Sequence, residues 1–164
     1  MGSKGTNIKS IFMKISLQFL FLLSIFFVSH CKIDDCEEML CFSPPPVLWF
    51  ELVDANTGEN LFTNGTYFKD QIKIQKVGDG TNVNFNFITE NELNLIGIHS
   101  IGWQTEIVNF SVGVSTNNIF KLHVDAKRVN ENCCSFTRFD EIKIENSNYE
   151  FDPKSGIYKI LVVL

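Results

Sequence analysis

Hydrophobic and polar residues alternate with a period of two over several short stretches between residues 47 and 164. The clearest stretch is residues 83–88, Val-Asn-Phe-Asn-Phe-Ile, and another covers residues 119–129. Alternation places the apolar side chains on one face of an extended strand, so both stretches predict half-buried β-strands. After Cys31 no stretch of about 12 residues repeats with the period of an α-helix. The pattern therefore favours strands throughout.

Turn-forming residues separate the predicted strands. Residues 54–58, 78–80 and 152–156 combine Gly with Asp or Asn, and Asn64-Gly65 predicts a hairpin joining residues 61–62 to residues 67–68. The last apolar run, residues 157–164, is apolar on both faces, which predicts a strand in the middle of a sheet. Further strands are predicted at residues 47–53, 72–75, 93–98, 106–114, 142–144, 148–151 and 157–164. About eight or nine short strands predict an all-β fold, an antiparallel β-sandwich of the Ig-like kind.

The N-terminal region has a different pattern. Residues 15–28 form an apolar run that three lysines precede, and the first acidic residue of the chain is Asp34. A membrane-spanning helix needs about 20 apolar residues, so the run is too short to be one. A basic segment followed by a short apolar run is typical of a secretory signal peptide. Met1 and Met13 both remain as start sites, because the sequence from Met13 is a complete signal peptide by itself.

The residues at the end of this run, Val28-Ser29-His30-Cys31, resemble the lipobox of bacterial lipoproteins, with His30 where a small residue is usual. The resemblance implies a diacylglyceryl group on the sulfur of Cys31. Lys32-Ile33-Asp34-Asp35 then resembles the acidic export signal of surface lipoproteins in the Bacteroidetes. The two motifs cover residues 13–38 and imply an outer-membrane lipoprotein of the cell envelope that is exposed on the cell surface.

These segments predict three parts of the chain. Residues 1–30 are the signal peptide, residues 31–46 are a lipidated tether that ends in three prolines, and residues 47–164 are the β-sandwich domain. Without the three lysines of the signal peptide, 14 basic residues become 11 against 19 acidic ones, a net charge of −8. Nucleic-acid binding depends on a basic surface, so this charge argues against a nucleic-acid partner.

Four cysteines follow the predicted lipidation site, namely Cys36, Cys41, Cys133 and Cys134. An exported protein meets an oxidising compartment, which favours disulfides. A bond between adjacent cysteines would be strained, and Cys36–Cys41 would close only a short loop. We therefore expect the two N-terminal cysteines to bond to the other two, in either order. A four-cysteine zinc site is the alternative, but an adjacent pair is not the usual ligand spacing.

Candidate chemistry is sparse in the predicted domain. His99 and His123 have no metal-ligand or catalytic spacing, and no nucleophile motif is present, so we predict no catalytic residue, no metal site and no cofactor. Residues 54–59 alternate Asp and Asn as a calcium loop does, but they also read as a hairpin turn. Trp103 is predicted to lie in a loop, where its exposed ring would stack on a ligand.

The sequence thus predicts a lipid-anchored module without enzymatic activity that is held to the membrane by Cys31. It would bind a protein or glycan partner at the cell surface, or serve a structural role. One alternative is a secreted, soluble binding domain without a lipid. A second alternative is a metal-dependent hydrolase with an acidic cleft near His99 or His123.

Overall fold

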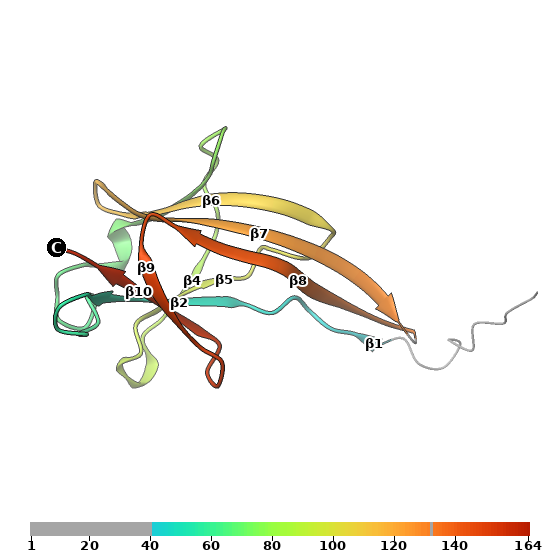
Figure 1. Ribbon diagram of the computed structural model, residues 1–164, viewed down its shortest axis with the longest axis horizontal. Helices are drawn as coiled ribbons and strands as arrows, with labels where there is room; N and C mark the ends of the chain where they lie inside the picture. The colour runs from blue at the N-terminus through green and yellow to red at the C-terminus, as the bar shows by residue number, and fades with distance from the viewer. Residues whose placement is uncertain (1–40, 132) are drawn as a thin grey trace, which may run out of the picture. The chain divides into compact units, whose positions relative to one another are not determined.

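The computed structural model describes residues 41–131 and 133–164, and this part of the chain is nearly all β-structure (Figure 1). The predicted signal peptide, lipidated Cys31, acidic tether and Cys36 lie outside the described residues. The strands are β1 (Cys41–Phe42), β2 (Leu48–Asp54), β3 (Ile72–Lys76), β4 (Asn86–Ile88), β5 (Leu95–Ile98), β6 (Glu106–Val114), β7 (Asn117–Glu131), β8 (Cys134–Glu145), β9 (Asn148–Asp152) and β10 (Ile157–Val162). Two short 3₁₀ helices, Lys69–Gln71 and Glu90–Glu92, lie in connections. The predicted all-β class is confirmed.

The strands form two five-stranded sheets. One has the order β1-β8-β7-β6-β3, and the other has the order β4-β5-β2-β10-β9. Most neighbours are antiparallel, but β1 runs parallel to β8 and β2 runs parallel to β10. The expectation of purely antiparallel sheets was therefore wrong, because β2 and β10, which come from opposite ends of the described chain, lie side by side and run in the same direction. β10 lies between β2 and β9, as its two apolar faces predicted.

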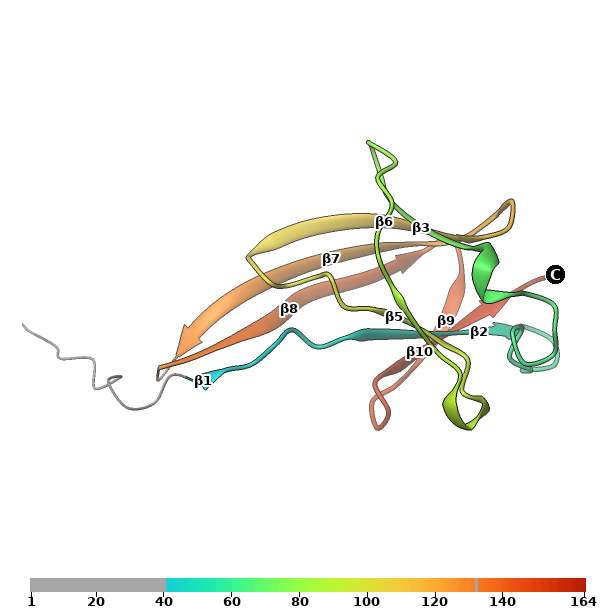
Figure 2. The same ribbon diagram turned by 180° about the vertical axis from the view of Figure 1, so that it is seen from behind.

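The two sheets share one hydrophobic core, an arrangement consistent with a β-sandwich (Figure 2). Alternate residues of β6 and β7 point inward, and Phe120 and Val112 are fully buried. Phe50 of β2 faces them from the other sheet, with its ring centroid 5.1 Å from that of Phe120. Burial of such side chains contributes about 1.5–3 kcal/mol each, so the side chains that the period-two pattern places inward are the main source of stability.

The hairpin predicted at Asn64-Gly65 was wrong. The side-chain oxygen of Asn60 accepts hydrogen bonds from the backbone amides of Phe62 and Thr63, at 2.9 Å and 3.2 Å. These bonds close the chain into consecutive turns instead of two paired strands. The segment then buries Leu61, so its apolar residues serve the core without forming a sheet.

The alternating stretch at residues 83–88 forms a strand only over β4. Its first half runs beside β3 of the other sheet, where the amide of Val83 donates to the carbonyl oxygen of Ile74 at 2.8 Å. The segment therefore passes from one sheet to the other within six residues. Alternation of side chains persists across this crossing, but continuous pairing with one sheet does not.

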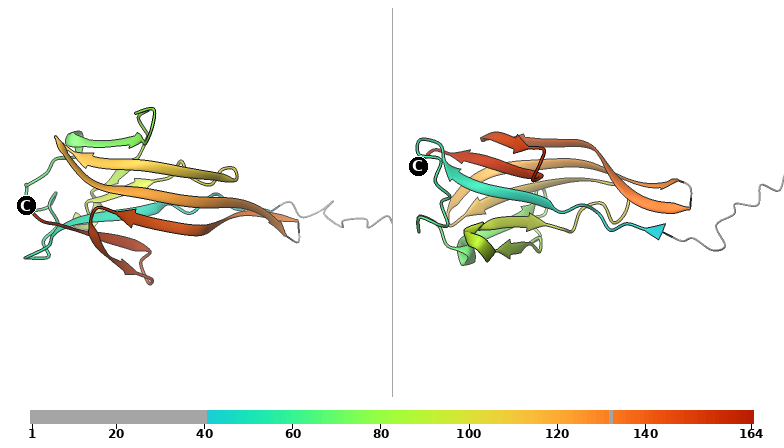
Figure 3. Two further views of the ribbon diagram at one scale, coloured as in Figure 1. Left: turned by 45° about the horizontal axis from the view of Figure 1, so that its top comes forward. Right: turned by 90° about the horizontal axis from the view of Figure 1, so that it is seen from below.

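The described fold begins before the three prolines that were expected to end the tether. β1 pairs with the start of β8 in the register Cys41↔Cys134 and Phe42↔Ser135, and Pro45 is buried. β7 and β8 form a long hairpin whose tip lies beside β1 (Figure 3). The other end of β8 leads into the turn before β9. The strand has 12 residues, so its two ends are roughly 36 Å apart.

Candidate ligand-binding surface

Trp103 lies in the β5–β6 connection and is 54% exposed, as predicted for a loop residue. Its indole N–H donates a hydrogen bond to the carbonyl oxygen of His99 at 2.9 Å. The ring stacks on Phe42 of β1, with the centroids 6.2 Å apart and the planes at 24°. One hydrogen bond and one ring contact thus fix the orientation of an aromatic surface that solvent can reach.

Arg128 of β7 is the third member of this surface. Its guanidinium carbon lies 4.4 Å from the centroid of the Phe42 ring, a cation–π contact. Phe42 is 62% exposed although it belongs to a strand. We call Phe42, Trp103 and Arg128 the Trp103 face.

The guanidinium of Arg128 is held by neutral acceptors. Its Nη1 donates to the carbonyl oxygen of Ser43 and to the hydroxyl of Thr137, both at 2.9 Å, and Nε and Nη2 donate to the hydroxyl and the carbonyl of Ser135. No carboxylate of the described residues forms an ion pair with it. Arg128 therefore joins β1 to the β7–β8 hairpin and keeps a positive charge that no described acidic group neutralises.

The β5–β6 connection is fixed against the same hairpin. The hydroxyl of Thr137, which is 9% exposed, donates to the carbonyl oxygen of Gly102 at 2.5 Å. Gly102 has a φ of +89°, and a Cβ atom there would lie 2.5 Å from the Thr137 side chain. Glycine is therefore required at this close approach. The neighbouring Trp103 is held by a well-defined backbone.

A groove of about 440 Å³ lies beside Trp103, within the usual size range of ligand sites. His99 and Glu106 line one side, and the β3–β4 connection lines the other. The Nδ1 atom of His99 is buried and has no hydrogen-bond partner among the described residues. One oxygen of Glu106 accepts the backbone N–H of Gly102 at 2.8 Å. Glu106 therefore supports the loop that carries Trp103.

His123 lies on the outer face of β7 and lines a different hollow from His99. Its Nδ1 lies 2.8 Å from the side-chain oxygen of Asn109, and its Nε2 lies 3.7 Å from a carboxylate oxygen of Glu141. The two histidines are not brought together. The described residues contain no group of three His, Cys, Asp or Glu side chains arranged to hold a metal ion.

One of the expected disulfides is present at the edge of the Trp103 face. Cys41 is bonded to Cys134, with their Cα atoms 4.5 Å apart and a sequence separation of 93. This pairing belongs to one of the two disulfide connectivities that the sequence left open. Cys133 is also disulfide-bonded, and the expectation for Cys36 lies outside the described residues. The bond ties the two-residue strand β1 to the long hairpin.

The outer face of the hairpin carries a cluster of three charges. Arg138 Nε donates to one oxygen of Asp140 at 2.7 Å, and Lys127 contacts the other oxygen. The hydrogen bonds from Arg138 and Lys127 lower the pKa of the Asp140 carboxyl below its ordinary value. The hydrogen bond and the charge interaction with Asp140 raise the pKa of Lys127. These groups are exposed, so the cluster has a small effect on stability at neutral pH.

The calcium-like segment forms a turn. One carboxylate oxygen of Asp54 accepts the backbone amides of Asn56 and Thr57, at 2.7 Å and 3.2 Å. Residues 54–59 thus use Asp and Gly as an ordinary turn does.

Sequence reasoning found Trp103 but missed Phe42 and Arg128. Phe42 lay in the segment assigned to the tether, and only the pairing of β1 with β8 brings it to Trp103. Arg128 could have been found from its position in the alternation of β7. It stands in phase with the buried residues Val124 and Ala126 of β7, so its side chain points inward. An inward arginine at the end of a strand indicates a cation held by acceptors.

None of the protein-family models, curated proteins or solved structures compared with the chain matches it. Over residues 41–131 and 133–164, no helix is long and apolar enough to cross a membrane.

Proposed function

We propose that the protein is a lipid-anchored lipoprotein of the cell envelope, exposed on the cell surface, that binds its partner without catalysis through the Trp103 face. The observation that carries this proposal is the exposed ring pair of Phe42 and Trp103, whose orientation Arg128 and the β5–β6 connection hold. Large exposed aromatic side chains that are held rigidly are costly to solvate and are typical of binding surfaces.

The anchor is proposed from the sequence. The lipobox-like Val28-Ser29-His30-Cys31 supports lipidation at Cys31, ten residues before the first described strand. Each buried CH₂ group contributes about 0.8 kcal/mol, so two or more acyl chains would hold the protein stably where one would not. The acidic residues after Cys31 support export to the cell surface.

We propose a glycan or a protein as the partner. The flat faces of Trp103 and Phe42 suit the C–H face of a sugar ring or an apolar side chain, and Arg128 adds a positive charge. We also propose that the two packed sheets form an Ig-like sandwich. Two sheets of mainly antiparallel strands over one core support this class.

Metabolic labelling with palmitate tests the anchor. The wild-type protein should incorporate label in its native host, and Cys31→Ser should not. Protease treatment of intact cells should remove the domain if it faces outward. A labelled Cys31→Ser variant, or full protection from protease, would contradict the proposal.

Co-sedimentation with cell-envelope material from the native host tests the binding surface. Trp103→Ala should lower the bound fraction about tenfold, whereas Phe68→Ala, which removes another exposed ring (59% exposed), should not change it. Treating the envelope material with periodate destroys a glycan partner, and treating it with protease destroys a protein partner. Equal binding of the two variants would refute a role for the Trp103 face.

Two other functions predict different results. A secreted soluble domain would carry no palmitate and would leave the cell in the wild-type form. A metal-dependent hydrolase would retain stoichiometric metal after purification, which elemental analysis detects, and would use the groove that His99 and Glu106 line.

A further inference from the structure

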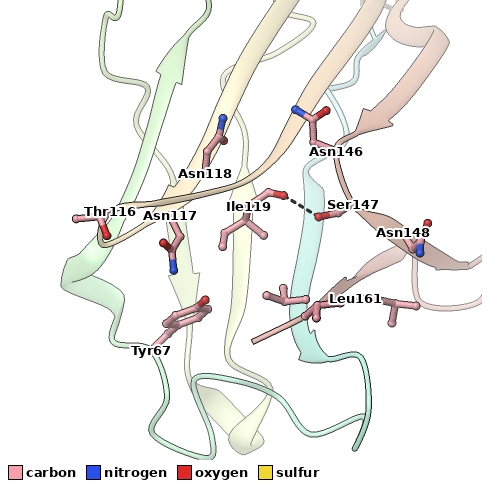
Figure 4. A pocket seen from close by; sticks show the side chains of 11 residues that line it. Tyr67, Thr116, Asn117, Asn118, Ile119, Asn146, Ser147, Asn148 and Leu161 are labelled. Carbon is pink, nitrogen blue, oxygen red and sulfur yellow. Dashed lines mark hydrogen bonds between the residues drawn. The ribbon is translucent and has the colours of Figure 1, made fainter.

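A second hollow lies at the end of the fold opposite the disulfide, with a volume of about 810 Å³ (Figure 4). The β6–β7 turn, the β8–β9 turn and the last residues of β10 surround it. Ser115 and Asn146 adopt left-handed backbone conformations, with φ of +58° and +71°, which give these turns a defined shape. The Trp103 face lies near the start of β8 and the hollow lies just beyond its end, so the two sites are independent.

None of the described side chains that line this hollow is charged. Its polar groups are amides and hydroxyls, contributed by Asn117, Asn118, Asn146, Ser147 and Asn148 together with Thr116 and Tyr67. Amides and hydroxyls both donate and accept hydrogen bonds, as the hydroxyl groups of sugars do. We propose that this hollow binds an uncharged oligosaccharide.

Tyr67 lines one side of this hollow. Tyr67 is only 8% exposed, and its ring centroid lies 6.2 Å from that of Phe62. Figure 4 shows its hydroxyl pointing toward the side-chain amide of Asn117 across the hollow, with no hydrogen bond drawn between the two groups. This hydroxyl does not belong to the buried polar atoms that lack a partner, so it faces the open hollow, where it can bond to a ligand. A ligand hydroxyl placed between the two groups would bond to both.

The floor of the hollow is apolar and preformed. Ile119 is 6% exposed and Val162 is 7% exposed, so neither needs to move to receive a ligand. The hydroxyl of Ser147 donates to the carbonyl oxygen of Ile119 at 2.7 Å, which fixes one turn against the other (Figure 4). A sugar ring presents C–H groups on its faces and hydroxyls at its edges, and this combination matches an apolar floor with a polar rim.

Charged ligands and peptides fit less well. A buried anion or cation needs an opposite charge, and the lining supplies none. Extended peptides bind to sheet edges or apolar grooves. Here turns form the rim, and their amides point individually into or around the hollow.

The test uses the full-length protein purified in detergent and immobilised oligosaccharides. The neutral probes are oligomers of glucose, mannose and N-acetylglucosamine, and the charged probes are uronic-acid and sulfated oligomers. We expect binding to at least one neutral oligomer and no preference for the charged ones. Tyr67→Phe keeps the ring and the packing, and should weaken binding about fivefold. Asn117→Ala should weaken it about tenfold.

Matched controls remove the same chemical groups elsewhere. Tyr158→Phe and Asn86→Ala lie outside the hollow and should bind as the wild type does. The proposal would be overturned if no neutral oligomer bound, if charged oligomers bound better, or if the combined Tyr67→Phe and Asn117→Ala variant kept full affinity while its unfolding midpoint was unchanged. Loss of binding in Trp103→Ala alone would assign the sugar to the other face.

Discussion

The contact between Phe50 and Phe120 joins the two sheets, and its removal tests whether they pack over one core. Both side chains are fully buried, and their ring centroids lie 5.1 Å apart at an interplanar angle of 40°. Phe→Leu removes three buried carbons at each site. At about 0.8 kcal/mol per buried carbon group, each substitution should lower the free energy of unfolding by about 2 kcal/mol.

The double variant measures the contact itself. Tilted aromatic pairs contribute about 0.5–1.5 kcal/mol beyond their buried area. Each single variant loses that term, but the double variant loses it only once. The combined cost of Phe50→Leu and Phe120→Leu should therefore be smaller than the sum of the single costs by about 0.5–1.5 kcal/mol.

Urea unfolding under non-reducing conditions gives these free energies. With a slope of about 2 kcal/mol per M, each single variant should shift the midpoint by about 1 M. Phe68→Leu is the matched control, because its ring is exposed and the change should stay within about 0.5 kcal/mol. A coupling energy of zero within error would show that the two rings do not touch, and the packing of the two sheets described above would then be wrong.

Three further predictions concern other parts of the fold. Mass mapping of non-reduced peptides should recover a peptide that joins Cys41 to Cys134; a free thiol at either position would contradict the pairing. Asp140→Asn should lower the unfolding midpoint at neutral pH but not at low pH. The lowered pKa of Asp140 means that its stabilising effect is present above the ordinary value of 3.8 and is lost as the pH falls below it, which unfolding midpoints at several pH values would detect. Gly97→Ala should lower the free energy of unfolding by about 1–3 kcal/mol, because the new Cβ would lie 2.3 Å from the Trp49 ring, and an unchanged midpoint would show that this ring moves freely.

Side-chain alternation was enough to predict most of the strands. Ile72 and Ile74 are buried in β3 while the residues between and after them are exposed, as their spacing implied. Local turn chemistry was less reliable. Asn64-Gly65 has the composition of a hairpin, but the side chain of Asn60, four residues earlier, captures the backbone amides first. Both turn signals are present in the sequence, and residue types alone do not show which of the two turns forms.

The candidate sites depend on contacts between residues far apart in the chain. Trp103 could be predicted as exposed because it follows Gly102 in a loop, but its partner Phe42 reaches it only through the pairing of β1 with β8. Tyr67 and Asn117 come together because different turns meet at one end of the fold. Alternation and turn signals describe each segment alone. They carry no information on which turns become neighbours.

The Cys41–Cys134 bond also decides how the protein would bear a mechanical load. A pull on the N-terminal segment would reach β8 through a covalent link, so the two residue pairs between β1 and β8 would not have to resist peeling. The force would then travel along β8, whose many hydrogen bonds to β7 are loaded together in shear, toward the turn at Asn146. A ligand held at that end would load the hydrogen bonds between β7 and β8 in shear.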